Sequence, residues 1–321
     1  MSYPEQVWVE NPPCESLLTR VASGRGVAFA KRTHGVWDHL ALYLSGGWWA
    51  DQWRRCDQMI YKSQMPSDPE VYRERFAYLA YLRELLKDIS DPPSDDRWIH
   101  TISLNLDYLT RKLSRPGFFL KTRTDPRLLS YWEWNYTYRE IIDASNAATH
   151  RLQFAQTLTK GVVSNSILAL PDIARSFHTV VLAPSKMHDL AQRWNLEPTH
   201  VTFLPAPTWP DRRPQGSLFT DPVLPALQTY RIRHKLLSTL LSVQSRRPLL
   251  YLFEFGTCAQ WLIARLFRAR PGAAYLDMGR TLELWFPDSE WPLKAPTATV
   301  YRRASRAYYG ERRYLELKVG A

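Results

Sequence analysis

The chain has few cysteines and no long apolar run. Its three cysteines, Cys14, Cys56 and Cys258, are far apart and odd in number, which argues against a disulfide framework and a zinc site. No stretch approaches the ~20 apolar residues that span a bilayer. The sequence MSYPEQVWVENPP lacks a basic-then-apolar leader, and there is neither an internal repeat nor a low-complexity segment. These absences predict a cytoplasmic protein with reduced thiols and no transmembrane segment.

Positive charge and aromatic residues are abundant. The 321 residues include 42 Lys and Arg against 31 Asp and Glu, a net charge of +11, together with 13 Trp and 17 Tyr. Such a balance attracts polyanions, which include nucleic acid, acidic glycans, nucleotide diphosphates and anionic membranes. Aromatic rings stack on sugars and bases, but they also fill cores. Composition leaves both interpretations open.

Strand patterns alternate with helix patterns along most of the chain. This alternation predicts a single Rossmann-like α/β domain over residues 1–321, with a mostly parallel sheet and helices on both faces. Parallel strands are expected at 27–31, 162–165, 179–183, 201–204, 249–255 and 274–277. Helices are expected at 67–89, 98–113, 130–159, 171–177, 185–194, 227–244 and 258–268. The first three of these helices make residues 51–160 a mostly helical insertion.

The most informative segment is Pro248 to Trp285. It reads as a buried strand, a turn at Gly256, a helix from Cys258, a second strand and the turn Asp277-Met278-Gly279. In open α/β sheets, ligands bind at the carboxyl ends of the strands. The helix start after Gly256-Thr257 offers free backbone N–H groups to a diphosphate. The alternative is an ordinary βαβ crossover that binds nothing.

Three motifs follow one another at strand ends. They read KRTHGVW at 31–37, VVSNSIL at 162–168, and LFEFGTCAQWLIARLFRARPGAAYLDMG at 252–279. In this order the chain resembles the GT-D-type glycosyltransferases, across most of its length and least over 51–160. The resemblance implies transfer of a sugar from a nucleotide-sugar, most simply a UDP-sugar, to a hydroxyl group. The donor site that it implies comprises Lys31, Gly35, Ser164, Asn165, Gly256, Thr257, Asp277 and Gly279.

The first motif departs from the family. His34 and Val36 occupy the positions of the Asp-x-Glu pair that holds a divalent metal in the family. Valine cannot ligate a metal, so the metal site is unknown and we expect weak or absent metal dependence. On a helix, His34 and Asp38 share one face, which suggests either weak metal binding or a catalytic base oriented by a carboxylate. Alternatively, His34 caps the helix and Asp38 is a first-turn carboxylate.

Residues 290–321 form a basic, aromatic C-terminal segment. Tyrosines there alternate with Arg302, Arg303, Arg306, Arg312 and Arg313. Together with Trp48 and Trp49, these arginines suggest contacts with phosphates and bases. The proposed acceptor is therefore a hydroxymethylated base in DNA, 5-hydroxymethylcytosine, as in phage DNA hypermodification, which would place the enzyme in the host cytoplasm. Alternatives are a terminal helix docked through its tyrosines, a transferase that builds a surface glycan, and a non-catalytic nucleic-acid-binding protein with a degenerate donor site.

Two further residues have a simpler interpretation. Glu283 lies in RTLELWF, which is expected to be an exposed final strand. Cys258 has no evident histidine partner, so packing at a helix start is expected rather than a catalytic thiol.

Overall fold

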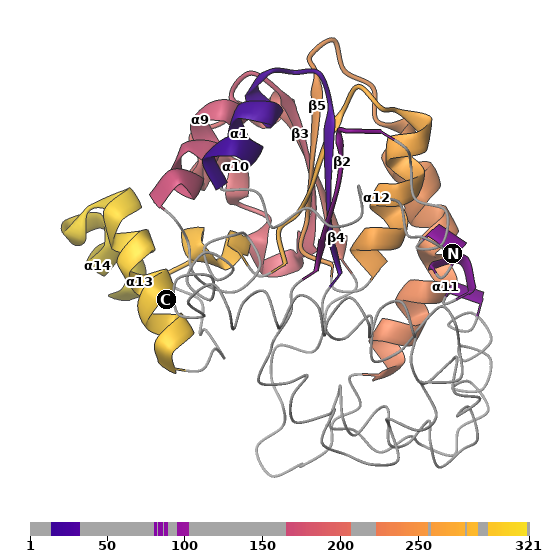
Figure 1. The fold of residues 1–321 in the computed structure, drawn as a ribbon. Coiled ribbons are helices and arrows are strands. Elements are labelled where there is room, and N and C mark those ends of the chain that lie inside the picture. The colour runs from indigo at the N-terminus through magenta and orange to yellow at the C-terminus, as the bar shows by residue number, and fades with distance from the viewer. Residues whose placement is uncertain are drawn as a thin grey trace, which may run out of the picture.

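A six-stranded, all-parallel sheet forms the centre of the molecule (Figure 1). The computed structural model describes residues 14–32, 80–81, 83–85, 87–88, 95–102, 165–206, 223–255, 258–279, 281–287 and 295–319. The strands are β1 (Val27–Arg32), β2 (Trp98–Ile102), β3 (His178–Pro184), β4 (Val201–Ala206), β5 (Leu249–Phe253) and β6 (Ala274–Asp277), in the order β2-β1-β6-β5-β3-β4. The predicted Rossmann-like α/β fold is therefore confirmed.

Helices cover both faces of the sheet (Figure 1). On one face lie α11 (Val223–Ser242), α12 (Cys258–Ala269) and a helical segment that includes Tyr81 and Leu85. On the other lie α1 (Cys14–Ala22), α9 (Leu170–Ala174), α10 (Leu190–Arg193) and α13 (Ala295–Tyr309), which α14 (Glu311–Val319) follows. Because both faces are covered, the strands are continuous apolar runs such as LLYLF, whose alternate residues enter different cores.

Each core takes alternate side chains of the central strands. Tyr251 and Phe253 pack on the α12 face, whereas Leu250 and Leu252 pack on the α1 face. Rings stack across neighbouring strands, with 4.9 Å between the ring centroids of Tyr251 and Tyr275. This sets the register in which Leu250 to Phe253 pair with Ala274 to Asp277. A shift of one residue would exchange the two faces.

Five of the predicted strands are confirmed, at 27–31, 179–183, 201–204, 249–255 and 274–277, with ends that differ by at most two residues. The predicted helix at 98–113 is wrong at its start, because Trp98–Ile102 is β2, which pairs in parallel with β1. Three of the five residues of WIHTI are β-branched, which favours a strand over a helix. The insertion proposed at 51–160 thus contains a strand of the sheet.

The strand predicted at 162–165 is contradicted only at its last residue. Asn165 begins the 3-10 helix η2 (Asn165–Ala169), which contacts α1, and residues 162–164 lie outside the described residues. Among the other predicted helices, the segment 67–89 is helical at its described residues from 80 onward. The helix expected at 185–194 is divided into η3 (Ser185–Met187) and α10. None of the described helices is long and apolar enough to cross a membrane.

A cluster of charged residues fixes the helical segment around Glu84 against α11 and α12. The Glu84 carboxylate accepts hydrogen bonds from Arg233 (2.9 Å), Trp261 (2.6 Å) and Arg265 (3.1 Å). Asp88, one turn further on, accepts from Arg265 and Arg268. The Arg265 guanidinium also lies 4.1 Å from the Trp261 ring centroid. Paired charges therefore anchor a segment that precedes β2 to the two helices α11 and α12.

Candidate functional site

The candidate site lies at the carboxyl edge of the sheet, between β5 and β3. After β5 the chain continues into α12 on one face, and after β3 it continues into α10 on the other. Because these connections leave two adjacent strands toward opposite faces, the carboxyl ends of β5 and β3 form the switch point at which open α/β sheets commonly bind ligands. Side chains that follow β3, β5 and β6 are therefore the first candidates for ligand contacts.

Asp277 is the last residue of β6 and lies opposite Phe253 of β5. Its side chain is 3% exposed, and its Oδ1 accepts a hydrogen bond from the backbone N–H of Gly279 at 3.1 Å. Gly279 has a φ of +55°, a conformation that glycine adopts without strain. The Asp-x-Gly turn thus holds a buried carboxylate at the strand end, where the motif predicted it.

A second charged pair lies near this edge. Lys186 follows β3, and its Nζ lies 3.8 Å from Oε1 of Glu283 in η5 (Thr281–Trp285), which follows β6. The expectation that Glu283 lies in an exposed strand is wrong, since its side chain is only 3% exposed. The apolar neighbours Leu282, Leu284 and Trp285 bury this 3-10 turn in the core and take Glu283 with them. Lys186 was missed, although a lysine directly after a buried strand is a signal for it.

Glu254 and Cys258 flank the turn between β5 and α12. The backbone N–H of Glu254 donates to the carbonyl of Leu182 at 2.9 Å, which extends the β5–β3 ladder. Cys258 is 2% exposed, and burial raises the pKa of its thiol to about 12. The side chain is therefore a neutral thiol near neutral pH, as expected for a packing residue at a helix start.

The described structure brings some of the predicted donor residues to one edge. Lys31 lies near the end of β1 and pairs with Thr101 of β2, while the adjacent strand on its other side is β6, which ends at Asp277. Asn165 lies in η2, on the α1 face. The remaining predicted site residues lie outside the described residues: His34, Gly35, Asp38, Trp48, Trp49, Ser164, Gly256 and Thr257. Within the described part of the chain, no three His, Cys, Asp or Glu side chains gather as a metal site would require.

The basic C-terminal segment docks on the α1 face through tyrosines. Tyr308 donates to the carbonyl of Arg193 at 3.3 Å, Tyr309 donates to the carbonyl of Trp285 at 2.7 Å, and Tyr314 is 1% exposed. The five predicted arginines on α13 and α14 are all exposed. The docking expected of the structural alternative is therefore present, and among the described residues it leaves the basic face exposed.

These five arginines fall into two groups. Arg306, Arg312 and Arg313 form ion pairs with Glu311 or Glu316 at 3.2 to 3.4 Å. Among the described residues, the guanidinium groups of Arg302 and Arg303 have no such partner. Arg302 and Arg303 are therefore the strongest candidates for phosphate contacts.

No protein-family model, curated protein or solved structure matches this chain. The similarity to GT-D-type glycosyltransferases therefore rests on the three sequence motifs.

Proposed function

We propose that the chain is a glycosyltransferase that transfers a sugar from a nucleotide-sugar, most simply a UDP-sugar, to a hydroxyl group. The observation that carries this proposal is the buried Asp277 carboxylate at the carboxyl end of β6, beside the turn that leads from β5 into α12. A carboxylate at such a strand end suits hydroxyl recognition, because it accepts hydrogen bonds from ribose or sugar hydroxyls.

Few groups are needed for the transfer. The N–H groups of the first turn of α12, with the positive charges of Lys31 and Arg32, stabilise the departing diphosphate in this proposal. His34 removes the proton from the acceptor hydroxyl, and Asp38 orients the imidazole. The reaction exchanges one C–O bond for another: the anomeric carbon leaves the diphosphate oxygen and bonds to the acceptor oxygen. Val36 cannot ligate a metal, so no step is assigned to a metal ion.

The test is a donor screen with mass spectrometry of the products, using hydroxymethylcytosine DNA, unmodified DNA and a glycan as acceptors. Asp277→Asn retains an oxygen for the Gly279 N–H, so the turn is preserved while the charge is lost. We expect transfer to fall about 100-fold or more in this variant. The matched control is Asp172→Asn, an exposed aspartate of α9 paired with Arg175, which should leave transfer unchanged. Equal activity of both variants would contradict the role of Asp277.

The proposed acceptor is a hydroxymethylated base in DNA, and the exposed Arg302 and Arg303 support this choice. Replacing both with alanine should reduce the slope of log affinity against log salt by up to ~2, if both contact phosphates. The matched control replaces Arg246 and Arg247 with alanine; both are exposed and precede β5 at the amino edge of the sheet. If both double variants lose the same affinity, DNA binding depends on net charge and not on α13.

The exposed arginines of α13 also favour a second candidate, a non-catalytic nucleic-acid-binding protein with a degenerate donor site. The two candidates differ in their response to the donor. A transferase should gain thermal stability in the presence of a nucleotide diphosphate-sugar, whereas a pure binding module should gain none.

A further inference from the structure

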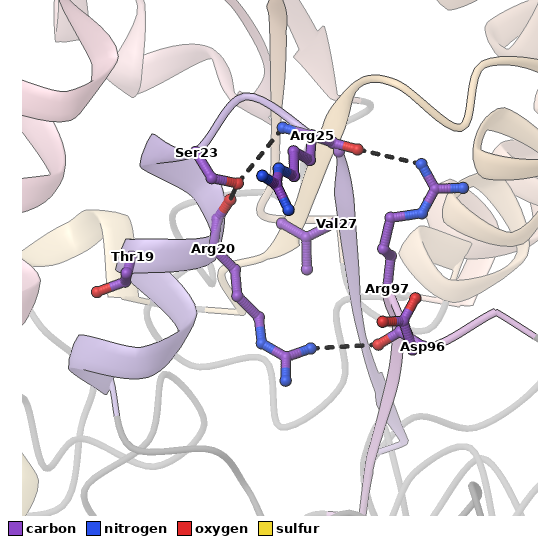
Figure 2. Close-up of a pocket in the computed structure, with 8 residues that line it drawn as sticks. Thr19, Arg20, Ser23, Arg25, Val27, Asp96 and Arg97 are labelled. Carbon is purple, nitrogen blue, oxygen red and sulfur yellow. Dashed lines mark hydrogen bonds between the residues drawn. The ribbon is translucent and has the colours of Figure 1, made fainter.

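A cleft of about 610 Å³ lies at the amino edge of the sheet, opposite the candidate donor site (Figure 2). Its walls are the end of α1, the turn that leads into β1, and the residues directly before β2 (Figure 2). Its volume lies in the range of small-molecule sites. Three of its lining residues are arginines, Arg20, Arg25 and Arg97, whereas Asp96 is the single acidic lining residue.

Arg97 is held rigidly and supplies charge. Its guanidinium donates to both oxygens of Asp95, at 2.9 and 2.6 Å, and to the carbonyls of Arg25 and Pro271, at 3.1 and 3.2 Å. These bonds use most of its N–H groups and tie three segments together. The hydrogen bonds from Arg97 lower the pKa of Asp95 to about 2, so this ion pair persists at neutral pH.

Arg25, in contrast, has a guanidinium that none of the described residues engages. Its backbone is fixed, because its carbonyl accepts from Arg97 and the following Gly26 has a φ of +82°, at a position where a Cβ would collide with the Pro271 carbonyl oxygen. Its side chain lies on the side of the turn that faces Arg20 and Val27 (Figure 2). Among the described residues, no hydrogen bond or ion pair engages that side chain. Arg20 makes one hydrogen bond, to the carbonyl of Asp96 at 3.2 Å, and retains further donors.

We propose that this cleft binds a small molecule that carries a phosphate group. Guanidinium groups bind phosphate through paired, charge-assisted hydrogen bonds, and Arg25 and Arg20 have such donors available. Three arginines against Asp95 and Asp96 leave a net charge of +1, which suits one phosphate better than a polyphosphate chain. The Asp96 carboxylate on the opposite wall accepts hydrogen bonds from hydroxyl groups of the ligand. A nucleoside monophosphate or a sugar phosphate has both features.

The experiment measures binding of adenosine monophosphate, ribose 5-phosphate and uncharged adenosine by isothermal titration calorimetry, on the full chain. Arg25→Gln removes the free guanidinium but none of the hydrogen bonds that fix the turn, because those bonds use backbone atoms. We expect this variant to bind both phosphates about tenfold or more weakly. The matched control, Arg246→Gln, removes an exposed arginine before β5 that does not line the cleft, and its affinity should equal that of the parent.

Several results would overturn the proposal. One is that the parent chain binds neither adenosine monophosphate nor ribose 5-phosphate. Another is that the Arg25 and Arg246 variants lose the same affinity for these phosphates, which would indicate general charge attraction. Binding of a DNA duplex that depends on Arg25, without binding of either small phosphate, would assign the cleft to a nucleic-acid surface instead. If the donor screen detects no sugar transfer, the proposed glycosyltransferase function fails but this proposal does not, because the cleft lies at the opposite edge of the sheet from the candidate donor site.

Discussion

Replacing Glu84 with alanine tests how far the charged cluster stabilises the fold. The Glu84 carboxylate accepts hydrogen bonds from Arg233, Trp261 and Arg265. The Arg233 side chain is only 6% exposed, so the substitution leaves a buried guanidinium without this carboxylate. Breaking a fully buried ion pair costs about 3–5 kcal/mol, and breaking an exposed one costs about 0–1 kcal/mol. Since the Glu84 side chain is 31% exposed, we expect a loss of about 2–3 kcal/mol.

The assay is urea unfolding followed by tryptophan fluorescence, which gives the free energy of unfolding and its dependence on urea. The matched control is Glu316→Ala, because Glu316 also bridges two arginines, Arg312 and Arg313, each at 3.2 Å. Both of these arginines are well exposed, and the control should cost less than about 1 kcal/mol. Alanine is the best helix former, so the substitution itself adds no helix penalty at either site.

Equal destabilisation by the two substitutions would refute the reasoning, because it would show that burial does not strengthen the Glu84 contacts. The double variant Glu84→Gln with Arg233→Met separates the cost of burying the Arg233 guanidinium without this carboxylate from the value of the pair. If that burial cost dominates, the double variant should be more stable than Glu84→Gln alone.

Three other predictions concern acid, glycine and thiol chemistry. Burial raises the pKa of Glu84, but the hydrogen bonds from Arg233 and Trp261 and the charges of Arg233 and Arg265 together outweigh it, so this pKa is lowered from 4.5. The pKa of Asp95 is lowered from 3.8 to about 2, chiefly by its hydrogen bond with Arg97. A carboxylate with a lowered pKa stabilises the fold at pH values above its unfolded pKa, and this stabilisation is lost as the pH falls. The free energy of unfolding should therefore decrease between about pH 4.5 and pH 2. A free energy of unfolding that does not change over this pH range would contradict the prediction. Gly26→Ala should cost at least about 2 kcal/mol in urea unfolding, because its φ is +82° and a Cβ would lie 2.1 Å from the Pro271 carbonyl oxygen. Gly24→Ala, with a φ of +66° and open space, should cost less. Cys258 should resist alkylation at pH 8 in the native chain and react after unfolding, which peptide mass spectrometry would detect.

The part of the candidate site that the sequence predicts is the turn after β6, because its structure depends on neighbouring residues. The Asp277-Met278-Gly279 turn follows a short apolar strand, and its conformation depends on a glycine with positive φ and on an aspartate that bonds two residues ahead. Such features depend on residues that are adjacent in the sequence. Lys186 and Glu283 were missed as a pair because they are far apart in sequence, and only the parallel arrangement of β3 and β6 within one sheet brings their loops together.

The sequence by itself determined the class of fold and most of its strands. Apolar runs such as VVLA and LLYLF are too short for helices, and they alternate with amphipathic segments, which requires a parallel sheet covered on both faces. Only the tertiary structure decided the strand order, the use of Trp98–Ile102 as an edge strand, and the amino-edge cleft. Arg20 and Asp96, which meet there, are 76 positions apart. Their contact depends on the pairing of β1 with β2, and no local pattern of residues specifies which strands become neighbours.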